Sequence, residues 1–166
     1  MKIPSEPKPT SIVAIQDTRE QCPWDLAPLQ TEISALSTGD YSVKGLTDVI
    51  AIERKSLVDL LGCLGVERER FQREMQRLLA YPTRAVICEC TWQELNAGEW
   101  KSRITPAAAV GSVLGWMSAG VPFVFCSNHE EAGRVASRML YIAARRRWRE
   151  ARGLLQSVLE LAEETG

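Results

Sequence analysis

Short apolar runs alternate along the chain with longer amphipathic stretches. Runs rich in β-branched side chains predict buried strands, at residues 12–15, 48–53, 85–90 and 122–126. Alternating polar and apolar residues predict another strand over 31–37, and a Lys-Gly-Leu-Thr turn predicts a hairpin that joins residues 41–43 to 48–53. The pattern thus begins with a strand meander.

Most of the remaining segments have apolar residues at helical spacing, and each such segment follows a residue whose side chain can cap a helix. The expected caps are Ser56, Thr91, Thr105 and Asn128. We expect the first helix to be interrupted near Gly62 and Gly65 and to end at Pro82. Alternating strands and helices predict an α/β fold, in which a mixed sheet carries helices on both faces.

Three segments follow from this pattern. Residues 1–10 contain three prolines and predict a flexible tail, residues 11–145 one domain, and residues 146–166 a helical extension that Gly153 could kink or break. Leucines and a valine between 154 and 161 form an apolar stripe on the extension. The stripe needs a partner, either the domain itself or a second copy, so a homodimer is expected.

Composition narrows the class of protein. The chain of 166 residues is 45% hydrophobic and 25% charged, as in an ordinary globular domain. Glycines and a proline break its best apolar run, so no membrane span is expected. Five scattered cysteines without zinc-site spacing predict reduced thiols in an intracellular, cytoplasmic protein.

The overall charge of −1 does not indicate a nucleic-acid-binding protein, but the local distribution of charge differs. Arg145, Arg146 and Arg147 precede Trp148 in an arginine-rich stretch that ends at Arg152. These arginines could contact phosphates, or they could form a solvated helix face.

Two acids and a lysine carry the clearest chemical signal, in Gly39-Asp40-Tyr41 and Glu53-Arg54-Lys55. We expect Asp40 at a strand end, and Glu53 and Lys55 on one strand face because they lie two residues apart. Two carboxylates can hold a hard divalent cation. A lysine beside them can contact a scissile phosphate or help to deprotonate water. Asp59, one helical turn later, could orient Lys55 or a metal-bound water. A surface Lys–Glu pair is the simpler alternative.

With Asp17-Thr18-Arg19-Glu20 upstream and Ser56, Asp59, Arg68, Arg70 and Phe71 downstream, the chain resembles the nuclease domain of the XPF family of structure-specific endonucleases. The resemblance covers about residues 11–145. It implies a restriction-endonuclease-like, three-layer α/β/α core around a central mixed sheet. It also implies metal-dependent cleavage of branched DNA, with Mg²⁺ or Mn²⁺ as the cofactor and DNA as the partner.

The resemblance also assigns roles to residues. Asp17, Asp40 and Glu53 would line the metal site, Lys55 would be catalytic, and Glu20, Arg54 and Asp59 would support them. Arg19 and Arg54 could contact DNA or pair with neighbouring carboxylates. The other candidate DNA contacts are Arg68, Arg70, Trp100 in a polar loop, and Arg145, Arg146 and Arg147.

Two features leave the function open. No helix-hairpin-helix module follows residue 145, so the chain resembles a stand-alone nuclease domain of phage or bacterial type, or one whose partners supply DNA affinity. A catalytically silent DNA-binding or scaffold subunit is the alternative, and a restriction or four-way-junction nuclease is a third. His129, the only histidine, is expected to be a solvated capping residue.

Overall fold

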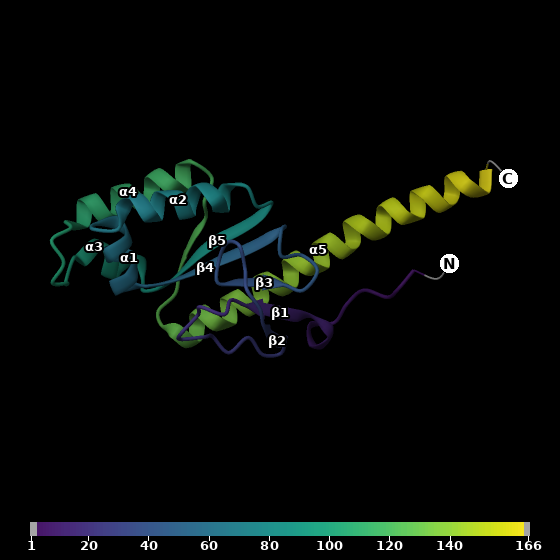
Figure 1. The fold of residues 1–166 in the computed structure, drawn as a ribbon, viewed down its shortest axis with the longest axis horizontal. Helices are drawn as coiled ribbons and strands as arrows, with labels where there is room; N and C mark the ends of the chain where they lie inside the picture. Colours follow the sequence, from purple (N-terminus) through teal and green to yellow (C-terminus); the bar gives the residue numbers. More distant parts are fainter. Residues whose placement is uncertain (1–2, 165–166) are drawn as a thin grey trace.

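The computed structural model describes residues 3–164, which form a six-stranded sheet with helices on both faces (Figure 1). The strands are β1 (Val13–Gln16), β2 (Gln30–Ile33), β3 (Tyr41–Val43), β4 (Ile50–Ser56), β5 (Thr83–Glu89) and β6 (Phe123–Phe125). Their order is β2-β1-β3-β4-β5-β6. β3 runs antiparallel to β1 and β4, whereas the pairs β1–β2, β4–β5 and β5–β6 are parallel. The predicted mixed sheet is confirmed.

The helices divide between the two faces of the sheet (Figure 1). One face carries α1 (Leu57–Leu64), α2 (Arg68–Leu79), α3 (Trp92–Ala97) and α4 (Pro106–Ser118), and the other carries α5 (His129–Glu164). A short 3-10 helix covers Pro9–Ser11. The predicted caps are confirmed, since each accepts a backbone N–H in the first turn of its helix, at Ser56, Thr91, Thr105 and Asn128. None of the helices within residues 3–164 is apolar enough over sufficient length to span a membrane.

The alternation of side chains along β4 separates two cores. Ile50 and Ile52 are buried beneath α5, whereas Ala51 is buried beneath the α1–α4 layer. The same alternation continues into the charged residues at the end of the strand. Four of the cysteines are buried free thiols, Cys63, Cys88, Cys90 and Cys126, and Cys22 is exposed.

Several strand boundaries differ from the prediction by one or more residues, and two of these differences bear on the site. β2 ends at Ile33 instead of Ser37, because the chain leaves the sheet and the Leu36 N–H turns to the Asp17 carboxylate. All four residues of β2 are exposed, so its side-chain alternation does not reflect burial. β4 runs on to Ser56, which keeps Lys55 within the strand. Asp40 precedes β3 and does not end a strand.

The two terminal segments lie together. Glu6 pairs with Arg149 at 2.9 Å and with Arg145 at 3.3 Å, so the predicted tail is in contact with α5. Helix α5 passes through Gly153 without a break and projects well beyond the sheet (Figure 1). The ends of the predicted tail and extension, residues 1–2 and 165–166, lie outside the described residues.

Candidate active site

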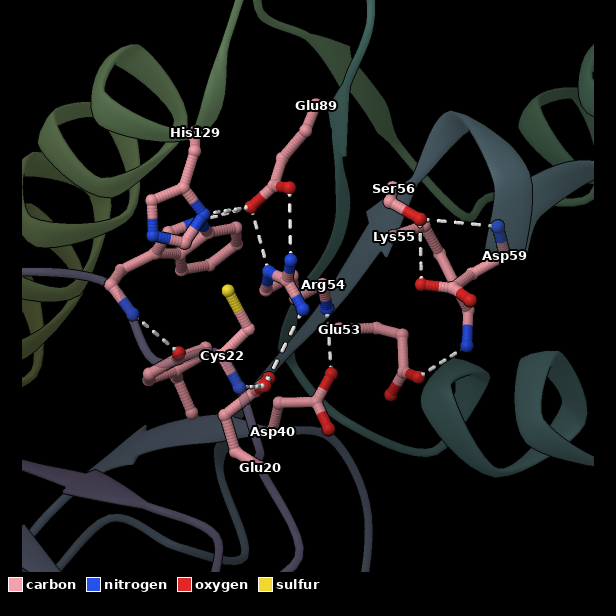
Figure 2. Close-up of polar contacts among 12 residues, drawn as sticks. Glu20, Cys22, Asp40, Glu53, Arg54, Lys55, Ser56, Asp59, Glu89 and His129 are labelled. Carbon is pink, nitrogen blue, oxygen red and sulfur yellow. Dashed lines mark hydrogen bonds and ion pairs between the residues drawn. The ribbon is translucent and has the colours of Figure 1, made fainter.

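Most of the predicted site residues line one cleft of about 830 Å³ at the ends of β3 and β4, which we call the carboxylate cleft. Figure 2 shows several of them converging from separate segments of the chain. The predicted residues in its lining are Arg19, Glu20, Asp40, Glu53, Arg54, Lys55, Asp59 and Arg70. Folding therefore brings together residues that are up to 51 positions apart in the sequence (Arg19 to Arg70).

A glycine turn fixes Asp40 in this cleft. Gly39 has φ of +79°, and a Cβ there would lie 3.0 Å from the Ile52 carbonyl oxygen, so the position favours glycine. The Asp40 N–H donates to that same carbonyl at 2.8 Å, and its Oδ2 accepts the Arg54 N–H at 2.7 Å. Asp40 Oδ1 has no hydrogen-bond partner among residues 3–164. One carboxylate oxygen thus stays available to a ligand.

Glu53 and Lys55 share a face of β4, as their spacing predicts. The Lys55 ammonium donates to Glu53 Oε1 at 2.7 Å and lies 3.4 Å from Oε2 of Glu74 on α2. Glu53 is 7% exposed and Lys55 6%, so this is a buried ion pair. Asp59 does not contact Lys55; its carboxylate accepts the Ser56 hydroxyl at 2.6 Å, which completes the helix cap (Figure 2). A direct contact through which Asp59 could orient Lys55 is therefore absent among residues 3–164, and its expected role beside a metal-bound water stays a prediction.

Burial sets the charge of these groups. It raises the pKa of Asp40 from 3.8 to about 6, against the opposing effect of the Arg54 N–H. Burial also raises the pKa of Glu53, although Lys55 counteracts this. Burial would lower the pKa of Lys55, but Glu53 and Glu74 outweigh it and raise that pKa. The cleft thus holds carboxylates whose ionisation is costly, next to a firmly protonated lysine.

The shift at Asp40 leads to a stability prediction. Between pH 4 and 6 the folded state binds the Asp40 proton more tightly than the unfolded state, so the wild type loses stability as the pH rises through that range. Asp40→Asn has no charge to bury and can still accept the Arg54 N–H. We expect its free energy of unfolding to be about 1 kcal/mol greater than that of the wild type at pH 8 without divalent cations.

Urea denaturation at pH 4.5 and pH 8 measures this difference, which should shrink at the lower pH. Equal stability of the two proteins at pH 8, or a less stable variant, would contradict the burial cost assigned to Asp40.

Asp17, also a predicted ligand, is not among the residues that line the cleft, and both of its carboxylate oxygens are hydrogen-bonded. Its Oδ1 accepts the backbone N–H and Nε of Arg19 at 2.9 and 2.6 Å, and its Oδ2 accepts the Leu36 N–H at 2.6 Å. Burial opposes these bonds, yet they hold the pKa of Asp17 below its usual value. No group of three His, Cys, Asp or Glu residues that could hold a metal ion occurs among the described residues. Asp40 and Glu53 both line the cleft, and each has one carboxylate oxygen without a hydrogen bond from residues 3–164.

Arg54 points through the sheet to the α5 side, because it alternates with Glu53 and Lys55 along β4. Its Nε and Nη2 donate to the two oxygens of Glu89 at 2.6 and 2.9 Å, and its Nη1 lies 3.4 Å from Glu20 (Figure 2). Glu89 also accepts from Trp24 Nε1 at 2.7 Å and contacts His129 Nδ1 at 2.6 Å. We call this set the Glu89 network.

Two arginines make the carboxylate pairs that the sequence left as one alternative. Arg54 pairs with Glu89 and Arg19 with Asp17, and contact of either arginine with DNA stays a prediction. Expecting His129 to be a solvated cap was wrong, because Asn128 caps the helix and the imidazole is bound to Glu89. Burial acts to raise the pKa of Glu89, but hydrogen bonds from Arg54, Trp24 and His129 outweigh it and lower that pKa below its usual value.

Other predicted contacts lie away from the cleft. Arg68 lines a groove between α2 and α4. The indole of Trp100 packs against the α1–α4 core and donates to the Ile104 carbonyl at 3.0 Å. On α5, Arg145 pairs with Glu6, and Arg146 and Arg147 pair with Glu150. Whether any of them binds DNA stays a prediction.

Sequence reasoning missed two cleft residues on α2, Glu74 and Arg77. Their signal was present in the spacing. Arg70, Glu74 and Arg77 each precede a buried residue of α2 by one position, so they form one face beside the apolar one. That face borders the cleft and places a second carboxylate, that of Glu74, beside Lys55.

Comparisons with known proteins identify the family and the fold. The family model of the ERCC4 domain matches residues 16–139. The solved structure of XPF from Aeropyrum pernix aligns with a TM-score of 0.62 and 18% sequence identity, over 79% of this chain and 61% of that chain. This chain therefore spans about three fifths of the Aeropyrum protein's chain. A search of curated protein sequences gave no match. The protein belongs to the ERCC4 domain family and has the fold of the XPF nuclease domain.

Proposed function

We propose that the protein is a divalent-cation-dependent DNA endonuclease that hydrolyses phosphodiester bonds, with branched DNA as its preferred substrate. The observation that carries the proposal is the buried Glu53–Lys55 pair beside Asp40, in a cleft open to solvent. Buried charges are costly unless they meet a ligand or one another. An excess of carboxylate over ammonium in this cleft fits a bound cation.

Asp40 and Glu53 have the oxygen donors that Mg²⁺ and Mn²⁺ prefer, and they would hold the ion. When bound, the ion supplies positive charge to phosphoryl oxygens and lowers the pKa of water. The Arg54 N–H orients the Asp40 carboxylate from behind at 2.7 Å. Asp17, with its four hydrogen bonds, would fix the β1 end of the cleft in place of a direct role at the ion.

Lys55 acts in this scheme as a fixed cation. Its raised pKa keeps it protonated at neutral pH, which disfavours the alternative role as a base for water. The ammonium can donate to a phosphate oxygen while Glu53 and Glu74 hold it in position. Cleft-lining arginines at 19, 70 and 77 offer phosphate contacts by simple attraction.

A catalytically silent DNA-binding subunit is the second candidate. The observation that favours it is the lack of a cluster of three metal-binding side chains among residues 3–164. The buried Glu53–Lys55 pair weighs against it, because a subunit without chemistry gains little from an ion pair that is expensive to bury. The cleavage assay below separates the two.

The test is cleavage of labelled flap, fork, four-way and linear duplex DNA by the wild-type protein, with Mg²⁺, Mn²⁺ or EDTA. We expect cutting of branched substrates in either metal and none in EDTA. Cutting that persists in EDTA would refute the cation dependence, and binding without any cutting would favour the silent subunit. Equal cutting of linear and branched DNA would remove the substrate preference but not the chemistry. A stand-alone phage or bacterial origin and an intracellular location stay predictions.

A further inference from the structure

Helix α5 presents one continuous apolar face along two very different environments. Where the helix packs on the sheet, this face is buried, at Ala132, Ala136, Leu140, Ala143 and Ala144. The same helical spacing continues through Ala151, Leu154 and Val158. Beyond about residue 145 the helix leaves the sheet (Figure 1), so the face emerges into solvent: Leu154 is 71% exposed and Val158 61%.

A helix that projects from the body needs a cover for such a face. In proteins most helical stability comes from packing of the apolar face, and propensity contributes less. Leu155 is also exposed beside Leu154 and widens the stripe. Within residues 3–164, the N-terminal segment makes its polar contacts with α5 at Tyr141, Arg145 and Arg149. The stripe from 151 to 158 therefore lies beyond the polar contacts that residues 3–10 make.

The charges of the extension identify what would cover it. Residues 145–153 contain five arginines and one glutamate, whereas residues 154–164 contain three glutamates and no lysine or arginine. Two copies side by side in parallel would set like charges together. Two copies in opposite directions would set the basic half of each against the acidic half of the other, and would also oppose their helix dipoles.

We propose that the α5 extension, residues 146–164, pairs antiparallel with the same segment of a second copy of this chain. The heptad pattern gives the register, with Ala151 and Val158 at one core position and Leu154 at the other. Leu154 of one copy then packs against Val158 of the other, and Arg152 lies level with Glu160. Pairing uses a surface outside the carboxylate cleft, so it does not depend on the proposed nuclease activity.

The mass in solution tests the pairing. Light scattering of the full chain across a concentration series should give twice the chain mass of 18.5 kDa. Leu154→Glu with Val158→Glu should return it to one chain mass, whereas Gln156→Glu, on the outer face of the same turn, should not. A wild-type monomer at every concentration, or a dimer that survives the double substitution, would overturn the proposal. Circular dichroism of the variants verifies that the domain stays folded.

Cysteine cross-linking tests the direction, in a Cys22→Ser background because Cys22 is the exposed native thiol. A mixture of Leu154→Cys and Val158→Cys chains should form a disulfide between the two variants, at several times the yield of either variant alone. Preferential cross-linking of Leu154→Cys chains to one another would indicate parallel pairing and would refute the arrangement. Capture of a different protein or binding to lipid vesicles by a monomeric chain would equally refute it.

Discussion

Glu53→Gln is expected to slow DNA cleavage by at least about a thousandfold, the scale of losing a group that stabilises charge in a transition state. The substitution keeps the size of the side chain but removes the negative charge that pairs with Lys55 at 2.7 Å. It also removes one of the two carboxylates that would hold the cation. Single-turnover cleavage of a branched substrate in saturating Mg²⁺ gives the rate, and calorimetric titration with Mn²⁺ gives the loss of cation affinity independently of activity.

Glu32→Gln is the matched control. Glu32 pairs with Lys44 on the surface, far along the sheet at the exposed β2 edge, and both side chains are at least half exposed. Cleavage and cation affinity should match those of the wild type, since surface ion pairs contribute little. A Glu53→Gln protein that cuts within tenfold of the wild type would exclude the proposed site, whatever the outcome for branched substrates.

Glu89→Ala is expected to lower the free energy of unfolding by about 3 kcal/mol, the scale of breaking a buried ion pair. Glu89 accepts both Arg54 contacts, the Trp24 indole and the His129 ring within 2.9 Å. Removing its carboxylate leaves the Arg54 guanidinium, 12% exposed, with only the longer contact to Glu20. The shift in the urea midpoint measures the loss.

The control for this prediction is Glu32→Ala, which also truncates a paired glutamate but on the surface, and should cost less than about 1 kcal/mol. The loss of unfolding free energy in Glu89→Gln should be smaller than in Glu89→Ala and larger than in Glu32→Ala, because the amide oxygen can still accept a hydrogen bond. If Glu89→Ala and Glu32→Ala destabilised the protein equally, the Glu89 network would be a peripheral contact. If Glu89→Ala unfolds the chain outright, Glu89→Gln still provides the comparison.

Local features of the sequence were enough to predict most of the fold. Helix caps act within one turn, so Thr91, Thr105 and Asn128 could be identified from their neighbours. The shared face of Glu53 and Lys55 follows from the two-residue period of a strand, which requires no knowledge of the rest of the chain. The motif was therefore visible before its surroundings were known.

The contacts that complete the site are non-local and left no such signal. Arg54 meets Glu89 only because β4 and β5 pair in parallel with Arg54 beside Ile87 and Ser56 beside Glu89. His129 reaches the same carboxylate from a helix 40 residues later. Asp17 accepts a hydrogen bond from the Leu36 N–H, 19 residues away. Strand register and loop paths decide these pairings, and neither appears in residue spacing.

The alternation of side chains along β4 has a consequence for how the cleft can be altered. Glu53 and Lys55 project from one face of the strand, and the Arg54 guanidinium projects from the other face. The Arg54 backbone N–H, which lies in the plane of the sheet, donates to Asp40 Oδ2 at 2.7 Å. A change on the α5 side that displaces the guanidinium is therefore expected to shift the Arg54 N–H and, with it, the Asp40 carboxylate. Distant substitutions around Glu89 would retune the geometry of Asp40 without touching a single cleft side chain.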